Sequence, residues 1–243
     1  MQNFLRYDNE GRAIAPIIPD MLTCDIVSHP DPISYADALG EQLRRQDALL
    51  DGSSQDTLLL LEHTPTITVG RASTPSDLLR TREELRADGI DVVETDRGGE
   101  ITYHGPGQFV AYPILNLENH GRDLHAYLRK LEETIIRTIA RFGIDGHRDP
   151  GFTGVWVGNG NEERKIAAIG IKARRWVTMH GIALNVDNDL TPFRRDIVPC
   201  GIADRGVTSV AEEYARAGRP GAPGRLDIER AFVEEFLTVF GYG

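Results

Sequence analysis

Two residues of the sequence have side chains suited to covalent chemistry, Cys200 and Lys165. Cys200 lies between a proline and a glycine, a turn composition in which backbone N–H groups can point at a thiolate or an oxyanion. Lys165 opens the apolar stretch KIAAIGIK, and a lysine beside apolar surface can act as an acid or a base because burial shifts its pKa. An ammonium ~4 Å from a thiol contributes about 4 kcal/mol at an effective dielectric of ~20, up to about three pKa units before desolvation. A Lys–Cys pair is therefore a sufficient nucleophile without a histidine.

A glycine-rich segment, RGGEITYHGPGQ (97–108), is a candidate ligand-binding loop. Its four glycines let a ligand approach the backbone and expose N–H donors, while Arg97, Thr102, His104 and Gln108 add side-chain donors. Farther along the chain, the small residues within KIAAIGIK leave room on both faces of a strand. That room suits a thin apolar ligand, or simply close packing.

Each candidate also has a structural alternative that the residues alone leave open. The glycine-rich segment is equally compatible with a hairpin that binds nothing. Lys165 could extend its ammonium into water, and Cys200 could be an inert buried cysteine. A zinc site from His104, His180 and Cys200 has no supporting ligand spacing, and His63 is expected to cap a strand end or line a cleft.

Composition narrows the function classes. Lys and Arg total 27 against 37 Asp and Glu, so the net charge of −10 disfavours binding to nucleic acid or to an anionic membrane. The two cysteines cannot form a disulfide framework, and we expect Cys24, in an apolar strand-like segment, to be structural.

Phosphate-binding, nucleophile-elbow and zinc-protease motifs are absent from the sequence. With no apolar run long enough to span a bilayer and no signal-peptide pattern, we expect a cytoplasmic protein.

The order of helical and strand-like segments predicts an α/β (α+β) fold, a single domain with a central mixed sheet flanked by helices. Apolar residues at helical spacing predict helices over 33–50, 124–142 and 226–240, and a capping box at Thr81 and Glu84 predicts a short helix over 82–88. Short apolar runs predict strands over 57–63, 66–70, 90–95, 155–158, 165–172 and 176–186.

The motifs RGGEITYHGPGQ, KIAAIG, HGIALN and PCGI, in this order, resemble those of lipoyl(octanoyl) transferases, within the superfamily of biotin and lipoate protein ligases. The resemblance runs from residue 58 to residue 210 and departs from the family pattern at Thr64 and Ile67. It implies a biotin/lipoate ligase-like fold. We expect residues 1–21 to be an N-terminal extension, 22–216 the catalytic domain, and 217–243 a Pro/Gly-rich loop and a helix packed on that domain.

The resemblance also implies an activity: transfer of an octanoyl (or lipoyl) group from acyl carrier protein to a specific lysine of lipoyl domains, the first step of endogenous protein lipoylation. The implied partners are octanoyl-acyl carrier protein, the lipoyl domains of 2-oxoacid dehydrogenase E2 subunits, and the glycine cleavage H protein. Cys200 is implied as the nucleophile that carries a thioester acyl-enzyme, and Lys165 as its partner and later base. No cofactor and no metal is expected, and we expect a monomer. The implied substrate-binding residues are Arg97, Gly98, Gly99, Glu100, Ile101, Thr102, Tyr103, His104, Ala168, Ile169, Gly170, Gly181, Ile182 and Ala183.

Three other functions compete with this interpretation. An ATP-dependent ligase would use Lys165 to contact a carboxyl or phosphate group and would not need Cys200. A non-catalytic carrier-binding protein would have no reason to keep both residues, and a cysteine hydrolase would need water and a histidine partner such as His104 or His180.

Because acyl carrier proteins are acidic and this chain is acidic too, docking requires a local basic surface. We predict one such face, formed by Arg164, Lys165, Lys172, Arg174, Arg175, Arg194 and Arg195.

Overall fold

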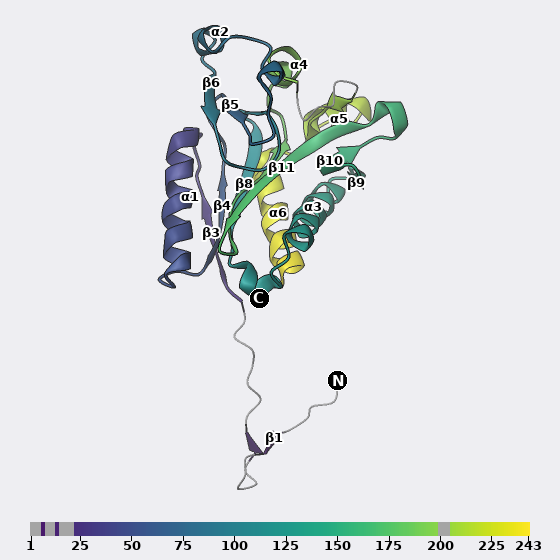
Figure 1. Cartoon of the computed structure of the whole chain (residues 1–243). Coiled ribbons are helices and arrows are strands. Elements are labelled where there is room, and N and C mark those ends of the chain that lie inside the picture. The colour runs from purple at the N-terminus through teal and green to yellow at the C-terminus, as the bar shows by residue number, and fades with distance from the viewer. Residues whose placement is uncertain (1–5, 8–12, 15–21, 199–204) are drawn as a thin grey trace.

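The structure is a computed structural model, and it describes residues 6–7, 13–14, 22–198 and 205–243 (Figure 1). Cys200, the predicted nucleophile, lies outside the described residues. No helix of the described part is long and apolar enough to cross a membrane.

A mixed sheet forms the centre of the described chain. Its strands follow the order β3-β4-β8-β12-β11-β10-β9, and β13 pairs with β11 beside that path. The β3–β4 and β11–β13 pairs are parallel and the other pairs are antiparallel, as the predicted mixed sheet requires. The strands are β3 (Cys24–Ser28), β4 (Asp56–Leu61), β8 (Gln108–Ile114), β9 (Gly146–Asp149), β10 (Phe152–Val157), β11 (Arg164–Arg174), β12 (Val177–Asn185) and β13 (Gly206–Val207).

Helices cover both faces of this sheet (Figure 1). Helix α1 (Tyr35–Leu50), capped by the Ser34 hydroxyl, packs Ala38 against Leu59, Leu61 and Val110 on one face. Helices α3 (Leu124–Ala140) and α6 (Arg225–Phe240) pack together on the other face and enclose the largest apolar core. Apolar residues at i, i+3 and i+4 give α3 the buried stripe that the sequence predicts.

A second, three-stranded sheet of order β6-β5-β7 lies beside the first. It shares a small core with Leu85 of α2 and Phe193 of α4. Its elements are β5 (Thr66–Val69), β6 (Asp91–Glu94), β7 (Thr102–His104), α2 (Arg82–Ala87) and α4 (Thr191–Arg195). The remaining elements are β1 (Arg6–Tyr7), which pairs with β2 (Ala13–Ile14), α5 (Val210–Arg216), and the 3-10 helices η1 (Pro75–Asp77), η2 (Leu117–His120) and η3 (Gly160–Glu162).

The predicted helices and strands are all present, with ends that differ by at most three residues. The glycine-rich segment does not form a hairpin, because β7 pairs with β5 in the small sheet and β8 with β4 and β12 in the large one. The short elements α4, α5, β9 and β13 were not predicted, because two to seven residues are too few to establish a period.

Candidate active site

A cavity of about 380 Å³ lies against the middle of β11 and β12. Ala168 and Gly170 of β11 pair with Ala183 and Gly181 of β12, so four small side chains share one stretch of its wall. A Cβ atom at Gly170 would lie 2.7 Å from the carbonyl oxygen of Gly98, and one at Gly181 would overlap the β8 backbone. Glycine is therefore required at both places, because the backbone of Gly98 and of β8 packs directly against them.

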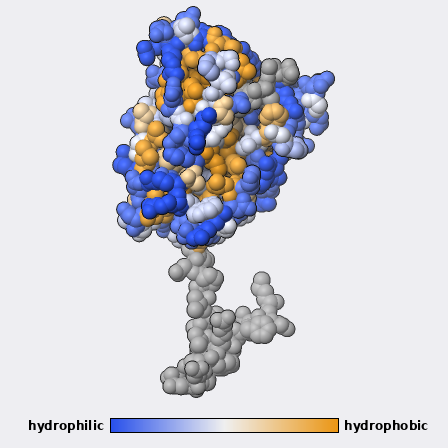
Figure 2. All heavy atoms as spheres, in the orientation of Figure 1, coloured by the Kyte–Doolittle hydropathy of each residue, from blue (hydrophilic) through white to orange (hydrophobic). Residues whose placement is uncertain are grey.

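The glycine-rich segment forms the opposite wall of this cavity. Gly98 N–H donates to the carbonyl of Ile171 at 2.9 Å, which ties the segment to β11. The guanidinium of Arg97 donates to both the backbone oxygen and the hydroxyl of Thr68, each at 2.9 Å. In the view of Figure 2, apolar side chains lie at the surface in the middle of the molecule, within a polar outline. The apolar lining residues Leu128 and Ile171 come from α3 and β11.

Buried aromatic and imidazole side chains gather at one part of the cavity and are here called the ring cluster: Tyr35, His63, His104, Tyr112 and His180. All of them except His63 line the cavity. The Tyr112 hydroxyl lies 2.7 Å from His63 Nε2, and Tyr35 OH lies 3.4 Å from His180 Nδ1. Burial lowers the pKa of His63 to about 4, lowers that of His104 well below its usual value, and raises those of both tyrosines. The ring cluster is therefore polar and uncharged at neutral pH.

The backbone at His180 explains how its imidazole joins the ring cluster. Its φ of 58° lies in the left-handed region, which is uncommon for a residue other than glycine. Its N–H donates to Gln42 Oε1 at 2.7 Å, and its Nε2 lies 3.2 Å from Asp96. Non-glycine residues in this region cost free energy and persist where their surroundings hold them, commonly at functional sites.

Lys165 lies toward the other end. His180 is paired with Ile171, six residues along β11 from Lys165, which corresponds to ~20 Å of strand. Lys165 is only 6% exposed, and its Nζ lies over the ring of Trp156, 4.9 Å from the ring centroid. Within the described residues, no carboxylate and no hydrogen-bond acceptor is paired with this ammonium. The Lys165 side chain, which lines the cavity, is thus almost fully buried, and its ammonium has no carboxylate partner among the described residues.

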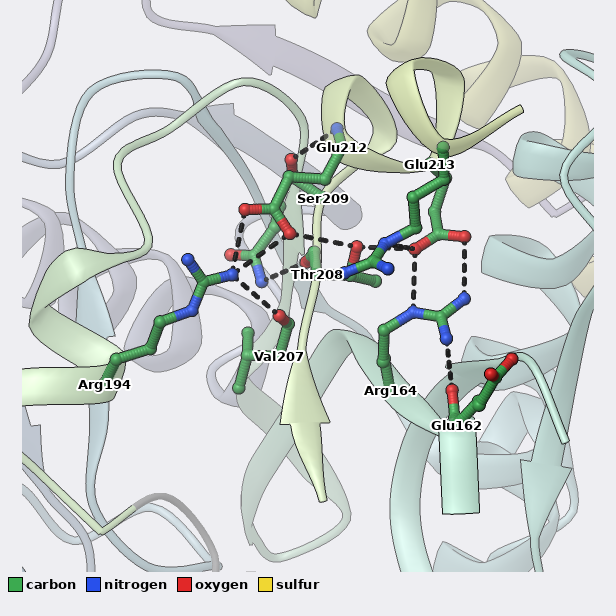
Figure 3. Close-up of polar contacts among 10 residues, drawn as sticks. Glu162, Arg164, Arg194, Val207, Thr208, Ser209, Glu212 and Glu213 are labelled. Carbon is green, nitrogen blue, oxygen red and sulfur yellow. Dashed lines mark hydrogen bonds and ion pairs between the residues drawn. The ribbon is translucent and has the colours of Figure 1, made fainter. Parts of the chain in front are cut away.

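An ion-pair network holds the start of β11 in place (Figure 3). Arg164 Nε and Nη2 donate to the two carboxylate oxygens of Glu213 at 2.9 and 3.0 Å, and the Thr208 hydroxyl donates to the same carboxylate at 2.6 Å. The backbone N–H of Thr208 donates to the carbonyl of Lys165 at 3.0 Å. Arg194 pairs with Glu212 at 2.8 Å (Figure 3). Together these contacts fix α5 and β13 against the residue pair Arg164–Lys165.

The catalytic-domain profile of the family described as "lipoyl protein ligase A/B catalytic domain" matches residues 34–236. The chain belongs to this family. An octanoyltransferase from Chloroflexus aggregans is 53% identical over 215 residues, covering 88% of this chain and 94% of that protein. One from Geobacter metallireducens is 46% identical over 204 residues, covering 84% and 88%. The predicted family is confirmed: the chain is an enzyme of the octanoyltransferase group within the biotin and lipoate ligase superfamily.

Solved structures of this superfamily have the same fold. A bipartite lipoate protein ligase from Thermoplasma acidophilum superposes with a TM-score of 0.68 at 14% identity, over 92% of this chain and 85% of that one. A biotin protein ligase from Aquifex aeolicus superposes with a TM-score of 0.52 at 15% identity, over 89% and 70%. The predicted α/β fold of the biotin/lipoate ligase type is confirmed.

The octanoyltransferase cavity contains most of the residues predicted to bind substrate. Their binding role stays a prediction. Tyr103 does not line the cavity, because its side chain packs against Phe193 in the small core, with ring centroids 5.7 Å apart. Residues that sequence reasoning missed are Tyr35, Ala72, Tyr112, Leu128 and the hairpin 151–153. They come from separate elements, so no local pattern in the sequence could group them.

The predicted single basic face is wrong. Arg164 and Arg174 lie at opposite ends of β11, ten residues or ~33 Å of strand apart. At the far end Arg174 pairs with Asp47 and Lys172 with Asp96. The predicted cations therefore form two separate groups, most of them paired with carboxylates.

Proposed function

We propose that this octanoyltransferase moves an octanoyl group from acyl carrier protein to a lysine of a lipoyl domain, through a thioester on Cys200. The observation that carries the proposal is the un-neutralised Lys165 ammonium at one end of a narrow cavity. The acyl chain would lie along the small residues of β11 and β12, with its carbonyl near Lys165 and its methyl end toward the ring cluster. Burial of each methylene contributes about 0.8 kcal/mol.

The position of Arg205 supports a role for Cys200. Arg205 follows Cys200 by five residues, a span of at most ~17 Å. Its guanidinium lies over the Trp156 ring, 5.2 Å from the centroid, and Trp156 also faces Lys165. Two residues later, Val207 pairs with Lys165 in the β11–β13 ladder. The connection along the chain therefore permits the Cys200 thiol to approach the Lys165 ammonium, which supports the proposed pairing.

In the first step, the Cys200 thiolate attacks the thioester carbonyl of the donor. A new C–S bond forms, the C–S bond to the carrier breaks, and the carrier thiolate leaves. The Lys165 ammonium gives it a proton and becomes a neutral amine. Because one thioester replaces another, the step is nearly isoenergetic and consumes no ATP.

In the second step, the amine of the acceptor lysine attacks the acyl-enzyme. Neutral Lys165 takes the proton released as the C–N bond forms, and the Cys200 thiolate leaves. Both residues return to their starting protonation states. Formation of an amide from a thioester is downhill and drives the sequence.

The proposed partners are octanoyl-acyl carrier protein as donor, and lipoyl domains of 2-oxoacid dehydrogenase E2 subunits and the glycine cleavage H protein as acceptors. The Thermoplasma acidophilum ligase of the same fold was solved as part of a lipoylation system with its E2 lipoyl domain. We further propose that the enzyme acts as a monomer in the cytoplasm.

The deciding experiment is intact-mass spectrometry of the protein mixed with octanoyl-acyl carrier protein, without ATP. We expect one octanoyl adduct on wild type that hydroxylamine removes, and none on Cys200→Ala. Cys24→Ala is the matched control and should keep the adduct, because burial raises the Cys24 pKa to about 12. Absence of both adduct and transfer without ATP would replace the transferase by an ATP-dependent ligase. Transfer without an adduct would mean direct attack by the acceptor lysine.

A further inference from the structure

We propose that Trp156 is a positioning residue that holds the Lys165 ammonium against its indole face, where no carboxylate among the described residues neutralises it. This inference rests on the proposed function. Cation–ring attraction is strongest for tryptophan and grows when the pair is removed from water. A carboxylate in the same place would hold Lys165 equally well but would cancel the charge that the thiolate needs.

The geometry around Trp156 supports this role. Trp156 is fully buried and pairs with Lys165 across the β10–β11 ladder, at a point where the register shifts. Its Nε1 has no hydrogen-bond partner within the described part of the chain, although buried tryptophans usually have one. Hydrogen bonding therefore does not explain the tryptophan, whereas its ring contacts two cations, the Lys165 ammonium and the Arg205 guanidinium.

The neighbouring backbone leaves room for the lysine. Gly154, with φ of 124°, lies two residues before Trp156 on β10. A Cβ atom there would lie 3.2 Å from Lys165 Cε and 2.5 Å from the carbonyl oxygen of Ala167. The lysine stem therefore runs across Gly154 toward the indole.

The charged groups near Lys165 are already occupied elsewhere. Asp149 and Glu163 pair with Arg205, and Glu213 pairs with Arg164. On α3, Glu132 pairs with Arg129 and Arg148 and accepts from Gly154 N–H. The cavity and the adjoining pocket add the ionisable side chains of Arg97, Glu100, His104 and His180. Among the described neighbours, the face of Trp156 is the group that contacts the Lys165 ammonium.

This role predicts how the Lys165–Cys200 pair titrates. The pair has two apparent pKa values, and the reactive form, thiolate with ammonium, exists between them. Weakening the ring attraction destabilises the ammonium, which lowers the upper value. An ammonium that is less well positioned stabilises the thiolate less, and this raises the lower apparent pKa of the pair. The pH window for acylation should therefore narrow from both sides.

Fluorinated tryptophan tests the inference without changing shape. The chain has two tryptophans, and Trp176, in the turn between β11 and β12, interacts through its backbone carbonyl. In a Cys24→Ser, Trp176→Phe background, Trp156 is the sole tryptophan and Cys200 the sole cysteine. This protein is made with tryptophan or with its mono-, di- and trifluoro forms, which progressively withdraw charge from the ring. The alkylation rate by iodoacetamide and the acylation rate are measured against pH.

We expect each fluorine to raise the apparent pKa of Cys200 in steps, by about one unit over the series. Alkylation at a pH well below the thiol pKa should fall about tenfold, and the alkaline limb of the acylation profile should move to lower pH. In parallel, Trp156→Phe should keep most of the low thiol pKa and Trp156→Leu should lose it. If Trp156→Leu does not fold, the isosteric fluorinated series still decides.

The outcomes separate this inference from the proposed function. A low thiol pKa that stays constant through the fluorinated series overturns the positioning role, while the acyl-enzyme on Cys200 stands or falls by its own mass measurement. A low activity of Trp156→Leu with an unshifted pH profile also overturns it, since that is the result of a merely structural tryptophan. A thiol that titrates near 8.5 in every form would remove the Lys–Cys pair itself.

Discussion

The two ends of the cavity bury polar groups in opposite ways. The ring cluster buries five side chains that have hydrogen-bond partners within the cluster or beside it and carry no charge at neutral pH. The other end buries one lysine whose charge has no counter-ion among the described residues. A buried charge without a partner costs free energy, and natural proteins keep such groups chiefly at functional sites. The contrast indicates that chemistry belongs to the Lys165 end, while the ring cluster shapes the cavity.

Removing the charge at the Lys165 end should have the largest effect. In Lys165→Met the thiol loses its cation, and a rise of up to about three pKa units lowers the thiolate fraction at pH 7 about thirtyfold. The variant also loses the group that protonates the leaving thiolate, so acylation at pH 7 should fall at least about a hundredfold. The measurement is single-turnover formation of the octanoyl adduct by intact mass. Lys130→Met is the matched control, because Lys130 also lies over an aromatic ring, Phe240, but outside the cavity. Near-normal acylation by Lys165→Met would show that the chemistry does not depend on the Lys165 end of the cavity.

The ring cluster should instead affect how the free energy of unfolding depends on pH. The pKa of His63 falls from 6.5 to about 4 in the folded protein because of burial, so between these values the unfolded chain binds a proton that the folded one does not. Stability is complete above pH 6.5 and decreases as the pH falls, by about 3 kcal/mol at pH 4 from this group alone.

Urea unfolding of wild type and His63→Gln at pH 7 and pH 4.5 measures the stability that His63 loses on acidification. Glutamine does not titrate, so the variant should lose less stability on acidification. The control is His125→Gln, which alters an exposed residue at the start of α3. Equal losses for wild type and His63→Gln would show that His63 is not a buried neutral imidazole.

Opening the end of the cavity should change the preferred chain length. Tyr35 lines the cavity and contacts His180, so Tyr35→Ala should create room beyond the octanoyl methyl group. Two extra methylenes contribute about 1.6 kcal/mol, so preference for decanoyl over octanoyl donor should rise about tenfold. Competition between the two donors, read as the ratio of adduct masses, measures it. Tyr35→Phe keeps the ring and should keep the wild-type ratio; the same ratio in Tyr35→Ala would place the chain end elsewhere.

The sequence indicated the glycine-rich wall, the small residues of β11 and β12 and the candidate lysine, because each is a local pattern. The sequence did not indicate Tyr35 and Tyr112. They lie on a helix and a strand that are far apart in sequence, and only the folded arrangement around the sheet brings them to the same cavity. Trp156 was visible in a predicted strand, but its place opposite Lys165 depends on a register shift that no periodicity encodes. The predicted basic face is wrong for a different reason, because residues near one another in sequence lie far apart along an 11-residue strand.

The two ends of β11 also give the smallest predicted effect, on docking of the carrier. The donor must present its thioester at the Lys165 end, where Arg194 is about half exposed and paired with Glu212 at 2.8 Å. Arg194→Glu should raise the KM for octanoyl-acyl carrier protein several-fold and reduce its dependence on salt, because one favourable charge becomes repulsive. Arg174→Glu, at the far end beside Asp47, should leave KM unchanged. Steady-state transfer at two salt concentrations compares them, and an equal rise in both would mean that the carrier senses overall charge rather than one end of the strand.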